Sequence, residues 1–460
     1  MLLSEVVDAD ISFRCESEFF KKKIMLAKAS IENCQKVSLL SEVAPDIQHP
    51  VEITRAYAES GYRMLLAQEV RCNQLVLGEG SYLDNPGAQF VKRNKLEVGD
   101  VVLTRTGANF GQCAPVLFDD ELFACADLLI IRKGAISAGY LSTFLNTWQG
   151  RLLLDRGAYG AAQPHIAPTY LKNLPIPIFS NLIKPISKLV ERSAATRTKG
   201  LEALLEAEKY LLNALALDNW TPPTPLSYTR SSSDAFTSGR LDAEHFQVQY
   251  DDIEQKIRRT KSGHTTIGEL VHDLMNGAEV REYQDIGVAY LRVGDLKNLD
   301  IDPDSVVQID PVAAEKGLEK IPLRKGDVLV SRSGSLAVTA VVEPEWEGAL
   351  ISSHLIRLRI RDERIDPYFL ALFLSILPGK KQILKWSNGG VQPEISQPSL
   401  SNILVPVLES HIQQEIRKNI LLSREERLKA TQLLDAAKRA VEIAIEDSEA
   451  SALAYLQGVI

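Results

Sequence analysis

The sequence predicts an α+β protein: two homologous globular modules in a pseudo-two-fold arrangement, separated by two long helices packed as an antiparallel coiled coil. Three observations predict it: four short motifs that recur in order, apolar strands that recur with them, and a long amphipathic segment after each copy. Repetition at a nearly constant offset is typical of a duplicated unit. The predicted parts are a first module (1–180), a first helix (181–218), a linker (219–239), a second module (240–407), and a second helix with the C-terminal tail (408–460).

Four pairs of motifs carry the repeat. Their offset drifts only from 226 residues (Arg14 to Arg240) to 229 residues (Gln163 to Gln392). The stretches between them share little sequence, which favours a constant frame with variable loops, the place where binding specificity usually lies. The pairs are RCESEFF (14–20) with RLDAEHF (240–246), LEVGDVVLTRTG (96–107) with LRKGDVLVSRSG (323–334), QPHI (163–166) with QPEI (392–395), and LKNLPIP (171–177) with LSNILVP (400–406).

Within each copy, a Gly-Asp turn signal precedes a run rich in Val and Leu, at 98–104 and at 326–332. Such short apolar runs after a turn predict buried strands. In a later strand of the second copy, Leu355, Leu358 and Ile360 alternate with Arg357 and Arg359. Each module is therefore predicted to mix α and β, with further strands at 126–132 and 350–360 and helical stretches at 138–151 and 367–386.

Each copy ends in a long helical segment, about 182–217 in the first and 411–446 in the second. Strong helix formers dominate both, and apolar residues recur three, four and seven positions apart. Each helix is expected to reach roughly 50 Å, with Gly200 as a possible break. The two stripes most simply bury against each other; the alternative is that each helix packs on its own module.

The segment between the copies, Trp220 to Asp234, contains three prolines and a serine run. This composition predicts a linker that is partly extended and partly flexible.

Bulk composition is that of an ordinary globular protein, with 45% hydrophobic and 24% charged residues. The five cysteines form no C-x-x-C pair, the N-terminal residues do not resemble a signal peptide, and no run approaches 18 apolar residues. We therefore expect a cytoplasmic protein without a membrane partner. The net charge of −8 argues weakly against nucleic-acid binding, although only the field of the contacting face matters.

The sequence lacks the motifs of an enzyme acting on DNA. A methyltransferase would need a glycine-rich cofactor turn and N-P-P-F or D-P-P-Y, and neither is present. Gly107 to Gly111 is too short for a phosphate loop, no P-loop occurs, and the histidines lack metal-ligand spacing. Asp46 and Glu52 could be the acidic pair of a metal-dependent nuclease, but the lysine that such a core needs does not follow them. We therefore expect no catalytic residue, no metal and no cofactor.

Over nearly its whole length, and best in the second copy, the sequence resembles the specificity (S) subunit of Type I restriction-modification enzymes. The resemblance rests on GDVLVSRSG (326–334), NGGVQPEIS (388–396), LSNILVPVLESHIQQEI (400–416) and the helix that follows. The first copy departs from it, with AYGAAQPHIA where NGGVQPEIS stands in the second and Lys184-Pro185 in the region of Gln413-Gln414.

This resemblance implies a non-catalytic protein in which each module is a target recognition domain for one half of a split, asymmetric DNA site. It also implies helices that set the gap between the half-sites and dock two methyltransferase (M) subunits. The implied partners are double-stranded DNA, these M subunits and, in a restricting complex, a restriction/translocase (R) subunit. The alternatives are a self-contained DNA-modifying enzyme and a coiled-coil scaffold without a DNA role.

Three groups of residues are candidates for DNA contact. The turns TRTG and SRSG offer hydroxyls, an arginine and a glycine at a strand end, which suit phosphate or base-edge contact; the alternative is a turn whose arginine pairs with a carboxylate. A glutamine in each loop suits an adenine edge, unless its role is structural. A cluster of arginines suits a phosphate track, unless it is a solvated strand edge. The residues are Thr104, Arg105, Thr106, Gly107, Ser331, Arg332, Ser333 and Gly334; Gln163 and Gln392; and Arg357, Arg359, Arg361 and Arg364.

Overall fold

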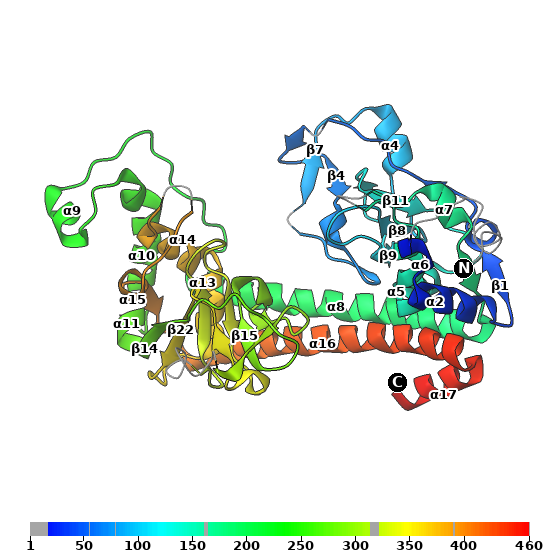
Figure 1. Cartoon of the computed structure of the whole chain (residues 1–460). Coiled ribbons are helices and arrows are strands. Elements are labelled where there is room, and N and C mark those ends of the chain that lie inside the picture. Colours follow the sequence, from blue (N-terminus) through cyan, green and yellow to red (C-terminus); the bar gives the residue numbers. More distant parts are fainter. Residues whose placement is uncertain are drawn as a thin grey trace. The chain divides into compact units, whose positions relative to one another are not determined.

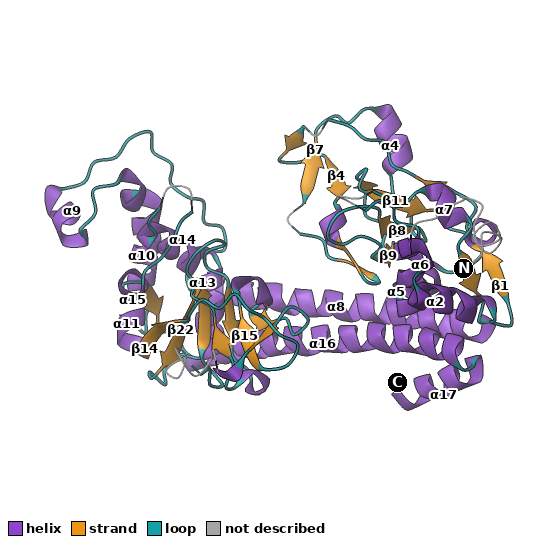
Figure 2. Ribbon diagram, viewed as in Figure 1, coloured by secondary structure: helices purple, strands orange, loops and turns teal. Residues whose placement is uncertain are grey.

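The computed structural model describes residues 17–54, 56–78, 80–160, 164–312, 322–389 and 392–459. The chain forms two compact units, one from residues 1–198 with 426–460 and the other from residues 199–425. Helices and strands occur in both units, as the sequence predicts (Figures 1 and 2). No helix in these described ranges is long and apolar enough to cross a membrane.

The first unit is built on a four-stranded antiparallel sheet in the order β2-β11-β8-β9. A second sheet has the order β10-β4-β7-β3, in which β10 runs parallel to β4. Two small ladders, β1-β12 and β5-β6, complete the strands. The bounds are β1 (Val37–Leu39), β2 (Ile47–Gln48), β3 (Tyr57–Ala58), β4 (Tyr62–Leu65), β5 (Val70–Arg71), β6 (Gln74–Leu75), β7 (Ser81–Leu83), β8 (Val101–Thr104), β9 (Cys113–Pro115), β10 (Leu122–Ala124), β11 (Leu128–Ile131) and β12 (Pro175–Pro177).

The second unit repeats this plan. Its main sheet has the order β14-β22-β19-β20, its second sheet the order β18-β15-β21 with β15 parallel to β21, and its ladders are β13-β23 and β16-β17. Because β8 and β19 occupy equivalent positions, the strand orders confirm the internal repeat. The bounds are β13 (His264–Thr266), β14 (Val271–Asn276), β15 (Val288–Leu291), β16 (Leu296–Lys297), β17 (Asp300–Ile301), β18 (Val307–Ile309), β19 (Val328–Ser331), β20 (Thr339–Val341), β21 (Leu350–Ile351), β22 (Leu355–Ile360) and β23 (Leu404–Pro406).

Both faces of the strands β8 and β19 in the two main sheets are buried. In β8, Val101 and Leu103 join a core that includes helices, while Val102 on the opposite face joins the core of the second sheet. Successive side chains of a strand point to opposite faces, so a sheet covered on both sides needs a continuous apolar run. This is why 98–104 and 326–332 are recognisable from sequence.

The stretches 138–151 and 367–386, each predicted as helical, are each divided into two helices. α5 (Ala138–Asn146) ends before Thr147, whose side chain accepts a hydrogen bond from the Gly150 N–H at 3.1 Å and caps α6 (Trp148–Arg156). In the second unit, α13 (Pro367–Ser375) and α14 (Leu377–Trp386) are also divided, but Ile376 between them makes no side-chain cap and a proline, Pro378, stands in the first turn of α14. A threonine that accepts from an N–H of the following turn favours a new helix start.

The two long helices are continuous: α8 (Ser180–Ala214) and α16 (Ser410–Glu446). The possible break at Gly200 does not occur; this residue is buried within α8. In the first unit the start of α8 lies antiparallel to the end of α16, and the Ser193 hydroxyl donates to the Ala430 carbonyl at 2.8 Å. The same part of α8 contacts α5, where a Cβ on Gly139 would lie 3.1 Å from the Ser187 Cα. Helix pairing and packing on the module therefore occur together.

The C-terminal segment belongs to the first unit. Apolar residues of α16 from Leu433 to Ile445 share a core with α5 and α8, and α17 (Glu449–Val459) adds Ala452 and Leu456. The Asn181 N–H at the start of α8 donates to the Glu449 carboxylate at 2.6 Å. A carboxylate at a helix N-terminus is stabilising. In the second unit, the end of α8 shares a core with the start of α16.

The linker contains a helix that the sequence does not predict, α9 (Ser232–Ser238), capped by Ser231 and ended by Gly239 in the left-handed region. Before α9, residues 219–231 have no regular secondary structure. Trp220 tethers this segment, because its indole N–H donates to Asp252 at 2.5 Å. The remaining helices are η1 (Ser17–Phe20), α2 (Lys22–Glu32), α3 (Leu40–Val43), η2 (Ala67–Glu69), α4 (Ala88–Asn94), α7 (Pro168–Lys172), η3 (Ala243–Phe246), α10 (Val248–Arg258), α11 (Ile267–Leu270), η4 (Val293–Asp295), η5 (Pro344–Trp346) and α15 (Gln397–Ser401).

Candidate nucleic-acid interface

In the second unit, two of the repeated motifs meet at the end of β19. The Ile395 N–H, in the QPEI motif, donates to the Arg332 carbonyl at 2.9 Å, and Glu394 forms a β-bridge with Ser333. Glu394 also exchanges two backbone hydrogen bonds of 2.7 Å with Asn388. The turn at 331–334 and the loop at 387–395 therefore form one local structure.

The hydroxyl side chains predicted to contact DNA are buried. Ser331 accepts from the Val338 N–H at 2.8 Å and donates to the Ser335 carbonyl at 2.6 Å, and Ser333 bonds the His354 imidazole. These contacts shape the turn. Thr104 and Thr106 are equally buried in the first unit. The hydroxyls of Thr104, Thr106, Ser331 and Ser333 are therefore not exposed to a ligand in the free protein.

The parts of each turn that reach the surface are the arginine and the glycine. Gly107 and Gly334 have φ values of 90° and 76°, a conformation that favours glycine. Arg332 forms an ion pair with Glu394 at 3.3 Å. In this copy the alternative prediction, an arginine paired with a carboxylate, is thus realised in the free protein.

The corresponding arginine of the first unit is different. Arg105 is half-buried and has no side-chain hydrogen bond or ion pair within the described ranges. The repeat explains the difference, because His165 stands where Glu394 stands in the second copy. His165 exchanges backbone hydrogen bonds of 2.9 and 2.8 Å with Tyr159, as Glu394 does with Asn388. The backbone frame is kept while the carboxylate is absent.

The two glutamine predictions have different outcomes. Gln163 lies outside the described residues. Gln392 is exposed. Near it, Gly389 has a φ of 101°, and a Cβ on Gly389 would lie 2.5 Å from the Gln392 carbonyl oxygen, so this position needs glycine. Gln392 remains a candidate for base contact.

The predicted arginine track is occupied by intramolecular contacts. Arg359 donates to Asp327 at 2.7 and 2.9 Å, and Arg357 is 1% exposed and donates to Asp273 at 2.5 Å. Arg361 donates to the Glu269 carbonyl, and Arg364 pairs with Asp362. In the free protein Arg357 and Arg359 are therefore engaged within the fold; the alternative of a solvated edge also fails for Arg357, whose side chain is buried.

The pair Arg359–Asp327 belongs to the frame of the fold. Arg132 and Asp100 form the same pair in the first unit at 2.6 Å. Each aspartate is that of the Gly-Asp turn signal, and each arginine follows it by the same interval in both copies. The sequence analysis did not predict this pair. An aspartate and an arginine at the same spacing in both copies were the signal that could have revealed it.

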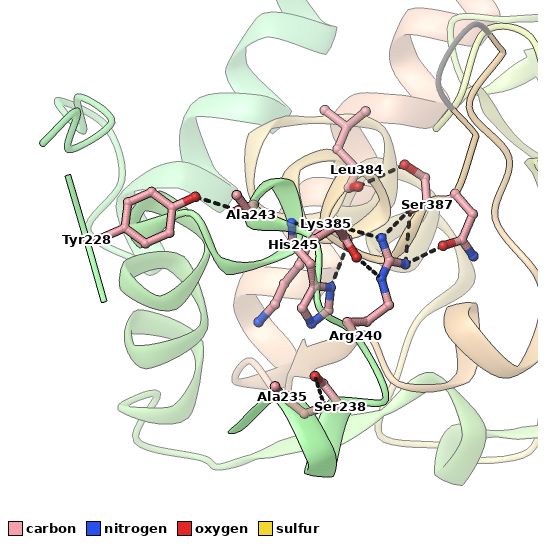
Figure 3. A network of polar contacts seen from close by, with 11 residues as sticks. Tyr228, Ala235, Ser238, Arg240, Ala243, His245, Leu384, Lys385 and Ser387 are labelled. Carbon is pink, nitrogen blue, oxygen red and sulfur yellow. Dashed lines mark hydrogen bonds and ion pairs between the residues drawn. The ribbon is translucent and has the colours of Figure 1, made fainter. Parts of the chain in front are cut away.

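A polar network around Arg240 holds the 387–395 loop (Figure 3). The Arg240 guanidinium donates to both Asp242 oxygens, at 2.6 and 2.7 Å, to the Ser387 carbonyl at 3.3 Å, and to the Asn388 side chain. The hydrogen bond from Arg240 lowers the pKa of Asp242 to about 2. The motif RLDAEHF, which had no assigned role, thus positions the loop that carries Glu394.

His245, in the same motif, is buried against this network. Its Nδ1 lies 2.8 Å from the Lys385 carbonyl, and its ring packs edge-on against Trp386 with centroids 4.8 Å apart. Burial lowers the pKa of the His245 imidazole. Phe19 occupies the equivalent position in the first copy and is also buried.

We expect His245→Phe to weaken the acid sensitivity of the second unit. The unfolded imidazole has a pKa near 6.5, and the folded value is lower, so the unfolded state binds more protons below that pH. The free energy of unfolding of the wild type should therefore fall as the pH drops through about 6.5. Urea unfolding across this range measures the slope, with Phe19→His as the reciprocal variant. Parallel pH profiles for wild type and His245→Phe would contradict the prediction.

Among the described residues, no group of three or more His, Cys, Asp or Glu side chains could hold a metal ion. The candidate interface consists of two turns whose arginines are partly exposed, Arg105 and Arg332, and of a loop with the exposed Gln392.

Comparison with known proteins finds a family that part of the chain resembles. Residues 267–422, which include the 331–334 turn and the 387–395 loop, match the model of the Type I restriction modification DNA specificity domain. No curated protein matches the chain.

Solved structures show a weaker likeness. The S subunit of a Type I restriction-modification system from M. genitalium is 14% identical, with 90% of this chain and 96% of that chain covered and a TM-score of 0.45. The HsdS subunit from Thermoanaerobacter tengcongensis is 15% identical, with 90% and 97% covered and a TM-score of 0.28. The family match confirms the predicted resemblance: residues 267–422 are similar to the Type I restriction modification DNA specificity domain.

Proposed function

We propose that this protein is the non-catalytic DNA-recognition subunit of a Type I restriction-modification complex and reads a bipartite, asymmetric site. The observation that carries the proposal is the specificity-domain match over 267–422, together with the same sheet order in the first unit. On this proposal, 1–180 and 240–407 act as target recognition domains, and the long helices act as a spacer.

The two turns are suited to unlike half-sites. Arg105 and Arg332 occupy equivalent positions at the ends of β8 and β19. Their neighbours differ between the units. Near Arg105 stand His165 and Asp127, whose carbonyl accepts from the Arg105 N–H. The equivalent residues near Arg332 are Glu394 and His354. Because base readout depends on a few side-chain donors and acceptors, different neighbours favour different base sequences.

The long helices carry apolar side chains that suit partner docking. Leu201 and Leu205 of α8 lie one turn apart and are each 56% exposed. Exposed apolar residues grouped on one surface are typical of interaction sites. We assign these helices to two methyltransferase subunits, with a restriction/translocase subunit as a further partner of a restricting complex.

Deletion and methylome sequencing test this function. In a host carrying the partner methyltransferase, loss of this chain should abolish methylation at one split motif, and re-expression should restore it. The purified chain should bind duplex DNA, more tightly with the methyltransferase present. An unchanged methylome would contradict the proposal, and methyl transfer by the chain alone would favour the self-contained enzyme instead.

A further inference from the structure

We propose that Glu394 is a specificity-determining residue of the second unit, an inference that rests on the proposed DNA-reading function. In the free protein its carboxylate holds Arg332. In the complex it accepts a hydrogen bond from the exocyclic amino group of a cytosine or adenine, and Arg332 is released toward the DNA. A half-site without that amino group leaves the carboxylate unpaired beside DNA and is rejected.

The backbone of Glu394 is held firmly. It exchanges two hydrogen bonds of 2.7 Å with Asn388, and the next residue, Ile395, is fully buried and bonded to the Arg332 carbonyl at 2.9 Å. Arg240 holds Asn388 and Ser387 from the other side. The backbone at position 394 is therefore set before DNA arrives.

The side chains, in contrast, are free to exchange partners. The Arg332–Glu394 pair is single, with an Nη2 to Oε2 distance of 3.3 Å, and the Glu394 side chain is 49% exposed. Exposed ion pairs of this kind contribute little stability. A ligand that offers Glu394 a donor and Arg332 an acceptor can replace the pair at small cost.

The chemistry of the carboxylate sets the selection. An ionised carboxylate has only acceptor atoms and repels phosphate, so DNA binding is favoured only where a base supplies a donor. In the major groove, cytosine N4 and adenine N6 are the available amino donors. The first unit lacks this requirement, because His165 replaces the carboxylate and Arg105 has no partner within the described residues.

Two variants test the inference by affinity, Glu394→Gln in the second unit and His165→Glu as its mirror image in the first. Glu394→Gln should bind random-sequence duplex about three- to tenfold more tightly at moderate salt, with a salt dependence steeper by about one released counterion. His165→Glu should bind it more weakly. Because glutamine can itself bond an adenine edge, selection from a random duplex library uses Glu394→Ala, which should lose the cytosine or adenine preference at one position of a single half-site.

The double variant Glu394→Gln with Arg332→Gln separates release of Arg332 from a general charge effect. It should bind random duplex no more tightly than Arg332→Gln alone, since the gain in the single variant comes from Arg332. Thermal unfolding checks that each variant folds. Unchanged affinity for Glu394→Gln and unchanged selected sequences for Glu394→Ala would overturn the inference while wild-type binding persists. Absence of wild-type binding, alone or with the methyltransferase, would instead remove the proposed function.

Discussion

Replacing Asp327 by alanine is expected to destabilise the second unit by about 3 kcal/mol, because removal of one partner from a buried ion pair leaves an uncompensated charge. Asp327 is 2% exposed and accepts two hydrogen bonds from Arg359 and one of 2.9 Å from the Arg324 N–H. It stands directly before β19, whose far end carries Arg332. The variant should therefore also weaken DNA binding.

Calorimetry or urea unfolding that separates two transitions would measure this effect. The unfolding transition of the second unit should shift to lower temperature or lower urea concentration, and that of the first unit should not change. Asp304→Ala, at an exposed position of the same unit, is the matched control and should change little. Asp100→Ala should shift the first unit instead, because Asp100 pairs with Arg132 there. Equal stability of the Asp327→Ala and Asp304→Ala variants would refute the assigned role.

Val441→Asp is expected to cost the first unit more than about 4 kcal/mol, since an unpaired charge would be placed in an apolar core. Val441 lies on α16 and is fully buried in the core that contains Val190 of α8 and Phe144 of α5. Although it follows the whole second unit in sequence, it belongs to the first. The transition of the first unit should therefore shift most.

Gln432→Asp provides the control for Val441→Asp. It adds the same charge to the same helix at an exposed position, and should alter stability by less than about 0.5 kcal/mol. Circular dichroism would report loss of the first unit, and the second-unit transition serves as internal reference. A shift of the second unit alone would show that the assignment of 426–460 to the first unit is wrong.

Much of the fold is predictable because its signals are local. The strands in 98–104 and 326–332, buried on both faces, are continuous apolar runs, and the long helices are stretches of strong helix formers with an apolar stripe. The repeat of the motifs around these runs also predicts that β8 and β19 are equivalent strands. The divisions between modules and the pseudo-two-fold coiled coil remain predictions.

The candidate site was only partly predictable, because composition does not reveal partners distant in sequence. The sequence predicts Arg357 and Arg359 as surface cations. In the structure Arg357 is buried and pairs with Asp273, and Arg359 pairs with Asp327. The hydroxyls of the two turns read as donors to DNA, yet they are buried. In a strand covered on both faces, alternation cannot distinguish a solvent-facing charge from one facing a second core.

By itself, then, the sequence determined the duplication, the strands within 98–104 and 326–332, the two long helices, and the two turns with their arginines, because periodicity and repetition are properties of the chain alone. Only the tertiary structure decided which charges are available. It brought Glu394 to Arg332 from 62 positions away in the chain, left Arg105 beside His165 without a carboxylate, and returned α16 to complete the first unit. Ion pairs and cores depend on distances in space, and these follow from the packing of the sheets rather than from neighbours along the chain.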